Sequence, residues 1–462
     1  MNKIPRIVIA GTNSGCGKTT ITCALLKAFI RRGLVCCAFK CGPDYIDPMF
    51  HSEVTRARSS NLDPFFFDDE TLKYLLWNNS QDCDLSVIEG VMGFYDGMGF
   101  DSTKASCFDV SNITESPVIL AVNAKGMSHS VLAMIEGFCS LHKPNNICGV
   151  ILNRCSKSAF EGLKDLIEDH FKGKIKVFGY LPDIPNAEIK SRHLGLVTAA
   201  EIDDLEIKLL ELSDAAEECM DLDALLETAK KAKALKIDQS RSFTTIKENE
   251  GFKDKCTRIA VARDKAFCFY YQDSLKALVE LGAELVSFSP VSDGKLPDDT
   301  DGLYIGGGYP ELYLKEISGN ESLRQAVKDA IESGMPCIAE CGGFMYLTEE
   351  IDGFPMVGAI RGKSVNKKRL TRFGYVTLTA DHDNMLCKKG EVVPAHEFHH
   401  YDSEFIGDDC TAEKRSGKNY KIGVGGETLC AGYPHMHFYS HPSLAVNFVK
   451  ACMKYRGLKN DR

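Results

Sequence analysis

The sequence predicts an α/β protein, with a mainly parallel sheet in its first half and a second α/β domain in its second half. Three observations lead to this prediction: β-branched runs alternate with helical periodicity, the runs are apolar throughout, and the pattern pauses once in a polar stretch. Continuous apolar runs are typical of strands buried on both faces, as in parallel sheets with crossover helices. In the first half the predicted strands are Arg6–Ala10, Val35–Lys40, Leu85–Glu89, Val118–Asn123, Ile147–Asn153 and Lys176–Tyr180.

Helical periodicity separates these strands and then follows the last of them. The predicted helices of the first half are Thr19–Arg32, Ser128–Ser140, Leu205–Leu212 and Asp221–Leu235. Residues 236–256 are polar and lack apolar periodicity, so they are predicted to form a linker. We therefore expect one domain over residues 1–235 and another over residues 257–462.

The second half resumes the alternation and ends in shorter, turn-rich strands. The alternating part is predicted as the strands Arg258–Arg263, Glu284–Phe288, Gly302–Ile305 and Cys337–Ala339, with helices near Asp273–Leu281 and at Glu321–Ser333. The turn-rich part is predicted as the strands Arg372–Thr379, Glu391–Phe398, Lys421–Val424 and Thr428–Tyr433.

Composition excludes several classes of protein. The chain has 462 residues, 44% of them hydrophobic and 26% charged, which is ordinary for a globular protein and unlike disordered or fibrous chains. The formal net charge is -9, whereas proteins that coat nucleic acid or membrane surfaces carry a basic excess. We therefore expect neither nucleic acid nor a membrane as a partner.

The 19 cysteines do not form a recognisable framework, because no two of them stand in a C-x-x-C pair. Their odd number and the absence of a secretory pattern at the N-terminus favour reduced thiols and a cytoplasmic protein. The longest apolar runs are far shorter than the ~20 residues that span a bilayer.

Residues 11–20 read GTNSGCGKTT and lie between a predicted strand and a predicted helix. In that position backbone N–H groups and a helix N-terminus face an anion, Lys18 reaches the β- and γ-phosphates, and the Thr19 hydroxyl can bind Mg²⁺. The predicted nucleotide contacts are Gly11, Thr12, Asn13, Ser14, Gly15, Cys16, Gly17, Lys18, Thr19 and Thr20. The first glycine comes one position earlier than in the usual phosphate loop, and in this the segment resembles the loop of dethiobiotin synthetase and its relatives.

Two acidic segments follow the next predicted strands, FKCGPDYIDP at 39–48 and IEGVMGFYDG at 88–97. Ligands of open α/β sheets bind at the carboxyl ends of the strands, so these segments should meet the loop. We predict Mg²⁺ ligation by Thr19, Asp47 and Glu89, since Mg²⁺ favours one or two carboxylates beside phosphate oxygens. The other predicted roles are charge neutralisation by Lys40, substrate positioning by Asp44, Tyr45 and Asp96, and an adenine contact by Asn153. Solvated turns and caps are the alternative for these carboxylates, and a strand-ending turn is the alternative for Asn153.

Near residue 341 the segment PCIAECGGFMY predicts a strand, a sharp turn and a helix, with Cys341 at the turn. Small residues surround a nucleophile at such an elbow, and a helix N-terminus activates a thiol. Backbone N–H groups of Gly307, Gly308 and Gly342 are predicted to form an oxyanion hole. The later segment GYPHMHF supplies His435 and His437.

These features resemble the class I glutamine amidotransferase domain, in which a cysteine and a histidine hydrolyse glutamine. The resemblance implies Cys341 as nucleophile and His435 as base. Two positions depart from the family pattern, because Ala339 replaces the first glycine of the elbow and His437 replaces the usual glutamate. The group that orients His435 is therefore either His437 or another residue.

Eight segments in the same order across nearly the whole chain are similar to the cobyrinate a,c-diamide synthase family: FKCGPDYIDPMFH, EGVMGFYDG, ARDKAFCFYY, GGGYPELY, AECGGFMYL, RFGY, HEFHH and GYPHMHF. The resemblance implies an ATP-binding amide synthetase domain fused to a glutaminase domain. It further implies amidation of the c and a acetate side chains of cobyrinate through acyl phosphates, with ATP, Mg²⁺ and L-glutamine. Arg372 and the histidines His396, His399 and His400 would then face substrate, with hydrogen bonding in a turn as the alternative for the histidines.

Other interpretations stay open at this point. Ni-sirohydrochlorin and hydrogenobyrinate present similar carboxylates and are alternative macrocycles. A different class of protein is also compatible with the first half, namely a ParA-like ATPase switch joined to a degenerate interaction domain. Cys341 separates these classes, because a degenerate domain needs no nucleophile framed by glycines. A homodimer is an assembly that the sequence allows.

Overall fold

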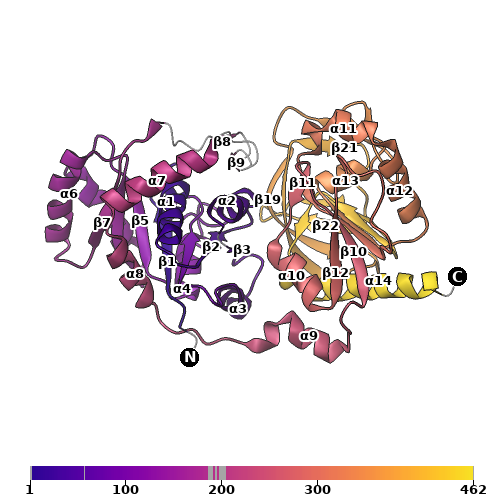
Figure 1. The fold of residues 1–462 in the computed structure, drawn as a ribbon, viewed down its shortest axis with the longest axis horizontal. Coiled ribbons are helices and arrows are strands. Elements are labelled where there is room, and N and C mark those ends of the chain that lie inside the picture. Colours follow the sequence, from indigo (N-terminus) through magenta and orange to yellow (C-terminus); the bar gives the residue numbers. More distant parts are fainter. Residues whose placement is uncertain (1–2, 57, 186–190, 193–194, 197–203, 461–462) are drawn as a thin grey trace. The chain divides into compact units, whose positions relative to one another are not determined.

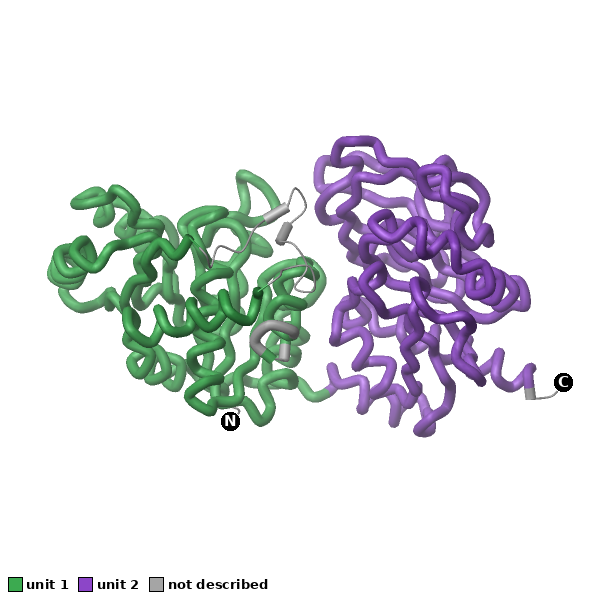
Figure 2. Tube along the Cα trace, turned by 45° about the horizontal axis from the view of Figure 1, so that its top comes forward, with its two compact units in different colours: residues 1–239 green, residues 240–462 purple. Residues whose placement is uncertain are grey.

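The computed structural model describes residues 3–56, 58–185, 191–192, 195–196 and 204–460 and divides the chain into two compact units (Figures 1 and 2). Unit 1 comprises residues 1–239 and unit 2 comprises residues 240–462. The division falls inside the stretch 236–256. This stretch also contains the short helix η3 (Gln239–Arg241) and the helix α9 (Phe243–Glu250).

Helix α9 was not expected, because its sequence carries little apolar periodicity. Ser242 caps its N-terminus by accepting a hydrogen bond from Thr244 N, and Gly251 ends it in the left-handed region at φ 70°. Phe243 anchors the helix, since its fully buried ring packs edge-on against Tyr439 at a centroid distance of 4.8 Å. The two caps and the buried ring of Phe243 therefore stabilise this helix.

Unit 1 is built on a seven-stranded sheet in which every neighbouring pair of strands is parallel. The strand order is β3-β2-β4-β1-β5-β6-β7, which confirms the predicted parallel sheet. The strands are β1 (Arg6–Gly11), β2 (Cys36–Cys41), β3 (Arg58–Leu62), β4 (Leu85–Glu89), β5 (Val118–Asn123), β6 (Ile147–Asn153) and β7 (Lys176–Leu181).

The helices of unit 1 are α1 (Lys18–Arg31), α2 (Ile46–Thr55), α3 (Asp69–Asn79), α4 (Cys107–Ile113), α5 (Ser130–Leu141), α6 (Lys157–His170), α7 (Leu205–Cys219) and α8 (Leu222–Lys230). A two-stranded ribbon pairs β8 (Ser191–Arg192) with β9 (Gly195–Leu196). Side-chain caps fix several helix starts: Asp68, Ser106, Ser156 and Asp221 each accept a backbone N–H.

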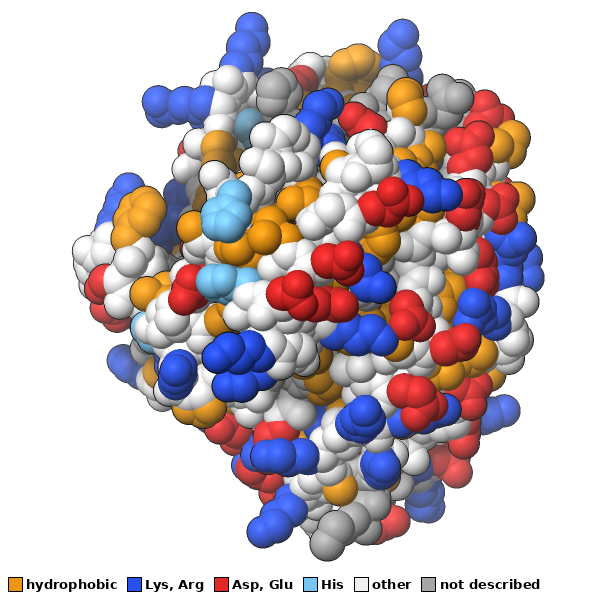
Figure 3. All heavy atoms as spheres, turned by 90° about the vertical axis from the view of Figure 1, so that its left-hand side faces the viewer, with side chains coloured by type: hydrophobic (Ala, Val, Ile, Leu, Met, Phe, Trp, Pro, Cys, Tyr) orange, Lys and Arg blue, Asp and Glu red, His pale blue; other side chains and the backbone are white. Residues whose placement is uncertain are grey.

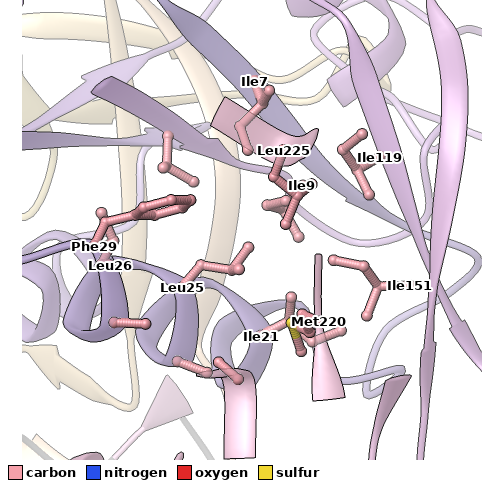
Figure 4. Packing of buried hydrophobic residues seen from close by; sticks show 14 of the residues in the cluster. Ile7, Ile9, Ile21, Leu25, Leu26, Phe29, Ile119, Ile151, Met220 and Leu225 are labelled. Atoms are coloured by element: carbon pink, nitrogen blue, oxygen red, sulfur yellow. The ribbon is translucent and has the colours of Figure 1, made fainter. Parts of the chain in front are cut away.

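Helices α1, α7 and α8 share a hydrophobic core with the sheet (Figure 4). Ile21, Leu25 and Phe29 of α1 are fully buried against strand residues such as Ile9 and Ile119. Each such side chain contributes about 1.5–3 kcal/mol to folding by leaving water. This packing fixes α1, and with it the loop that precedes α1, relative to the ends of the strands.

Unit 2 combines two larger sheets. The first has the order β12-β10-β13-β15-β25-β24 and is parallel except for its last pair. Its strands are β10 (Thr257–Ala262), β12 (Ala283–Phe288), β13 (Gly302–Ile305), β15 (Cys337–Glu340), β24 (Val424–Gly425) and β25 (Leu429–Gly432). The second is antiparallel, in the order β23-β22-β19-β20-β26, and comprises β19 (Arg372–Ala380), β20 (Val392–His399), β22 (Cys410–Glu413), β23 (Asn419–Ile422) and β26 (His435–Met436). The predicted strand 421–424 is thus split between β23 and β24.

Smaller elements complete unit 2. The short strands are β11 (Phe267–Phe269), β14 (Gly307–Gly308), β16 (Glu350–Ile351), β17 (Phe354–Pro355), β18 (Lys363–Asn366) and β21 (Tyr401–Ser403). The helices are α10 (Gln272–Glu280), η4 (Pro310–Leu312), α11 (Leu314–Gly319), α12 (Glu321–Glu332), α13 (Gly342–Leu347), η5 (Phe438–Ser440) and α14 (Ser443–Asn460). The observed mixture of helices and sheets confirms the predicted α/β class.

One pair of cysteines differs from the expectation that all thiols are reduced. Cys37 of β2 and Cys83, which follows α3, form a disulfide, with their Cα atoms 6.2 Å apart. The other 17 cysteines, all in described parts of the chain, are reduced thiols. The two bonded residues are brought together because β2 and β4 are neighbours in the sheet and Cys83 lies just before β4.

Acidic and basic side chains are interspersed on the face of unit 1 seen in Figure 3, with no large patch of one sign. Among the helices that the structure describes, none has the length and apolar character to cross a bilayer.

Candidate functional site

In unit 1 the predicted phosphate loop connects the carboxyl end of β1 to the first turn of α1. Gly15 and Gly17 adopt positive φ angles of 76° and 101°, which disfavour other residues. At Gly17 a Cβ atom would also lie 1.9 Å from Asn153 Nδ2, and at Gly11 it would lie 2.5 Å from Cys16 Sγ. Close packing beneath the loop therefore requires glycine, while residues 13–15 remain exposed on its outer side.

Lys18 spans the loop. Its ammonium donates hydrogen bonds to Asn13 O at 3.1 Å and to Met92 O at 2.6 Å. The side chain thus links the loop to the segment after β4.

Asn153, at the end of β6, donates a hydrogen bond from Nδ2 to Cys16 O at 2.8 Å. This contact supports the loop from below. The adenine contact of Asn153 stays a prediction.

Beside the loop, a buried charged cluster forms around Glu89, the last residue of β4. The parallel register places Lys40 directly opposite Glu89 on β2, and Lys40 Nζ donates to Glu89 Oε1 at 2.9 Å. Thr19 Oγ1 donates to the same oxygen at 2.5 Å, while His51 Nε2 lies 2.8 Å from Glu89 Oε2. Asp47, in the first turn of α2, forms an ion pair with Lys40. The structure thus assembles Thr19, Lys40, Asp47 and Glu89 in one place.

The charges in this cluster depend on one another. Burial alone would lower the pKa of Lys40, but Asp47 and Glu89 raise it well above its ordinary value. Burial alone would raise the pKa of Glu89, but Lys40 and His51 hold this pKa well below its usual range. Burial raises the pKa of Asp47 against the attraction of Lys40. Glu89 is therefore held in its anionic form.

Thr19 and Glu89 fit the ligands that Mg²⁺ takes beside a nucleotide, because both supply oxygen atoms and these lie together next to the loop. Asp47 is linked to Glu89 through Lys40. Within the part of the chain that the structure describes, no group of three or more His, Cys, Asp or Glu side chains could hold a metal by itself. A cation here would accordingly depend on phosphate oxygens and water, as Mg²⁺ commonly does.

The remaining predicted residues of unit 1 shape the surrounding turns. Asp44 Oδ1 accepts a hydrogen bond from Ile46 N at 2.9 Å, and Asp96 Oδ2 accepts one from Gly93 N at 2.8 Å. Tyr45 is buried at the start of α2. These contacts match the turn and cap alternative for both carboxylates.

His51 is a member of the cluster that the sequence analysis did not assign. It is fully buried and lies four residues after Asp47 on α2. Side chains spaced by four residues share a helix face, so this spacing is a signal by which His51 could have been found.

In unit 2, Cys341 stands at a sharp turn between β15 and α13, with φ 50° and ψ −105°. Both following glycines are required by close packing. A Cβ at Gly343 would lie 2.1 Å from Ile305 O, and one at Gly342 would lie 2.8 Å from Pro310 Cδ. A nucleophile elbow has this combination of a strained backbone and small neighbours.

The glycines predicted to form an oxyanion hole lie around Cys341. A Cβ at Gly307 would be 3.5 Å from Cys341 Cβ and 2.6 Å from His435 Cε1. A Cβ at Gly342 would be 3.2 Å from Gly308 N. The structure therefore brings Gly307, Gly308 and Gly342 next to the candidate nucleophile and base.

We expect Gly307→Ala to reduce glutamine hydrolysis by roughly 10²-fold, because the added methyl group must displace the imidazole of His435 by about an ångström. The rate of glutamate formation from glutamine measures this effect. Gly319→Ala is a matched control, since a Cβ there meets open space. Glutamate formation at the wild-type rate in the Gly307 variant would contradict the prediction.

His435 lies on β26 and is opposite His396 in the register with β20. Burial would lower its pKa, but Cys341 and Glu340 raise the pKa of His435 to about 10. Glu340 Oε2 is 3.8 Å from His435 Nδ1. The imidazole therefore carries a proton near neutral pH, beside the thiol.

His437 contacts two tyrosines. Its Nδ1 accepts a hydrogen bond from Tyr439 N at 3.2 Å, and its ring packs against Tyr271 at a centroid distance of 4.7 Å. Burial lowers the pKa of His437 to about 3. Its ring thus packs among aromatic side chains. No role was predicted for Glu340.

Arg372 begins β19 in unit 2, in a different unit from Asp44, Tyr45 and Asp96. Its guanidinium lies 4.7 Å from the centre of the Tyr420 ring. His399 stacks on Tyr433 at 3.9 Å, and its Nδ1 lies 2.7 Å from Tyr401 O. The rings of His396 and His399 are thus engaged in contacts within unit 2.

Each unit contains a region that matches a known protein family. Residues 7–197 match the family model described as the CobQ/CobB/MinD/ParA nucleotide binding domain, and residues 258–443 match the CobB/CobQ-like glutamine amidotransferase domain. Unit 1 therefore contains a nucleotide-binding domain, and unit 2 contains a glutamine amidotransferase domain.

Similar proteins extend over nearly the whole chain. A cobyrinate a,c-diamide synthase of Clostridium acetobutylicum is 41% identical over 450 residues, which cover 96% of this chain and 99% of that protein. One of Caldanaerobacter subterraneus subsp. tengcongensis is 40% identical over 97% of this chain and 98% of its own length, and one of Thermoplasma volcanium is 37% identical over 98% of both. Among solved structures, PurLQS from Thermotoga maritima covers 43% of this chain and 98% of its own, with 15% identity and a TM-score of 0.30.

Proposed function

The chain belongs to the cobyrinate a,c-diamide synthase family and is a ligase that takes its amido group from glutamine, and from this premise we propose that it amidates the a and c acetate carboxylates of cobyrinate. ATP would activate each carboxylate as an acyl phosphate, and ammonia released from glutamine would displace the phosphate. The observation that carries the proposal is the presence, in one chain, of a phosphate loop beside Glu89 and of a Cys341–His435 pair at a nucleophile elbow.

In unit 1, we propose that the loop N–H groups and Lys18 bind the phosphates of ATP. A substrate carboxylate oxygen attacks the γ-phosphorus, the bond to the β-phosphate oxygen breaks, and ADP leaves. Mg²⁺, when bound, neutralises charge on the phosphates. Because two carboxylates already offset the charge of Lys40, its proposed function is to hold Glu89 and Asp47 in position. Ammonia then attacks the acyl carbon, phosphate leaves, and the attacking nitrogen loses a proton to give the amide.

In unit 2, the Cys341 thiolate attacks the side-chain amide carbon of glutamine. Backbone N–H groups near Gly308 and Gly342 stabilise the oxyanion, and His435 donates the proton that lets ammonia leave. Water, deprotonated by His435, then hydrolyses the thioester to glutamate. A thiol and a histidine suffice for both steps.

The test is ADP release in the presence of glutamine and Mg²⁺, with cobyrinate, hydrogenobyrinate or Ni-sirohydrochlorin as the acceptor. We expect cobyrinate to give the highest kcat/KM, with one amide formed for each ADP. Faster turnover of another macrocycle would reassign the substrate. ADP release that none of the three stimulates would contradict the proposal as a whole.

The ParA-like alternative predicts a different result. An ATPase switch with a degenerate second domain would hydrolyse ATP without forming glutamate from glutamine. The full-length similarity to amide synthases and the elbow at Cys341 favour the ligase.

A further inference from the structure

Glu340, the last residue of β15, is a carboxylate to which the proposed mechanism assigns no role. It directly precedes Cys341, and only 2% of its surface is exposed. A buried carboxylate is costly unless charge or hydrogen bonds compensate it, so its partners indicate what it does.

Both oxygens of Glu340 have partners near the histidine. Oε1 accepts a hydrogen bond from Met436 N at 3.0 Å, one residue after His435. Oε2 lies 3.8 Å from His435 Nδ1 and accepts a hydrogen bond from Tyr304 OH at 3.3 Å. The carboxylate is therefore fixed from two strands, β13 and β26, with one oxygen toward the imidazole.

The elbow explains how two adjacent residues act on one imidazole. Successive side chains of a strand point to opposite faces. The left-handed backbone of Cys341, at φ 50°, breaks this alternation directly after Glu340. As a result, both the thiol and the carboxylate raise the pKa of His435.

We propose that Glu340 is the positioning residue of the glutaminase pair, holding His435 through Nδ1 so that Nε2 exchanges a proton with Cys341. This inference rests on the proposed glutaminase function and deepens it. It places the orienting carboxylate immediately before the nucleophile instead of at the position of His437. The described contacts of His437, with Tyr271 and Tyr439, are consistent with that assignment.

Among the described residues, titratable groups from several elements lie around His435. They are Cys341 at the start of α13, Glu340 on β15, Tyr304 on β13 through its bond to Glu340, and His396 on β20. Burial, together with His435, lowers the pKa of His396 to about 3, so His396 is neutral near pH 7. Loss of the Glu340 charge would therefore lower the pKa of His435, and the imidazolium would deprotonate at a lower pH.

The test compares Glu340→Gln with His437→Gln, a matched replacement of a buried neighbour, in the full-length protein. For the Glu340 variant we expect kcat for glutamate formation to fall about 10²-fold with little change in KM. The alkaline limb of the pH profile of kcat/KM for glutamate formation should move to lower pH, because this step needs the proton of His435. Amidation driven by added ammonium chloride should stay at the wild-type rate, and the His437 variant should keep both the wild-type kcat and the wild-type pH profile.

Two results would overturn the proposal: a wild-type kcat with an unmoved alkaline limb in Glu340→Gln, or a larger kcat loss in His437→Gln. If Glu340→Gln also loses ammonia-driven amidation, Glu340→Asp replaces it as the test. Because aspartate keeps the carboxylate, this variant must retain more glutaminase kcat than the soluble fraction of Glu340→Gln, or the proposal fails. A wild-type protein without glutaminase activity would instead contradict the proposed function itself.

Discussion

Cys341→Ala is expected to lose glutamine-dependent amidation by more than roughly 10³-fold while retaining amidation with ammonium chloride. The sulfur atom of Cys341 would form the thioester, and alanine has no nucleophilic atom in its place. Unit 1 contains its own phosphate loop and charged cluster, so its chemistry with ammonia should not need the thiol. Amide formation measured with each nitrogen source in parallel tests this expectation.

Cys337→Ala is the matched control for this prediction. Cys337 lies on the same strand, β15, and is fully buried, but it is four residues before the elbow. The control should therefore leave glutamine use close to the wild-type rate. Equal loss of both nitrogen sources in Cys341→Ala would contradict the separation of the two sites.

Glu89→Gln is expected to reduce ATP turnover by at least roughly 10²-fold, since a neutral amide cannot replace an anionic ligand for Mg²⁺. The change also leaves Lys40 with one carboxylate instead of two, inside a fully buried cluster. Breaking a buried ion pair costs about 3–5 kcal/mol, so we also expect a lower melting temperature. ADP release with saturating substrates and a thermal melt measure the two effects.

The control for Glu89→Gln is Glu70→Gln, because Glu70 is half-exposed and forms an ion pair with Lys73 on the surface of α3. Glutaminase activity, which belongs to unit 2, should persist in both variants and reports that the protein is folded. Near-normal ADP release in Glu89→Gln would contradict the role assigned to this carboxylate.

The sequence predicted the parallel sheet of unit 1 well, because six of its strands are continuous apolar runs. Strand β3 escaped prediction, since Ser59, Ser60 and Asn61 are polar. Their polarity has a structural reason at Asn61, whose Nδ2 donates to Gly42 O and Asp44 O at 2.9 and 2.7 Å and so shapes the start of α2. The apolar pattern of a sequence predicts strands that pack against apolar neighbours. It does not predict a strand whose side chains are polar and form hydrogen bonds.

Site residues could be predicted where they lie at the end of a strand. They could not be predicted where the backbone of a turn sets the direction of the side chain. Strand-end reasoning placed Lys40 and Glu89 in neighbouring segments, and the register sets them directly opposite each other. The same reasoning could not find Glu340, because its approach to His435 depends on the backbone dihedral angles of Cys341. Nor could it foresee that the amide of Asn153 donates a hydrogen bond to the loop backbone.

The parallel pairing of β15 with β25 determines when the glutaminase site can assemble during protein synthesis. Residues 337–340 pair with residues 429–432, and Met436 lies 96 residues after Glu340. Closing a loop of this length costs conformational entropy before any contact repays it, and non-local parallel pairing is slow to form. A nascent chain that has exposed Cys341 to the cell therefore still lacks its base. Glutamine hydrolysis can begin only after the strand that ends in His435 has been translated and docked, by which time all of unit 1 has left the ribosome.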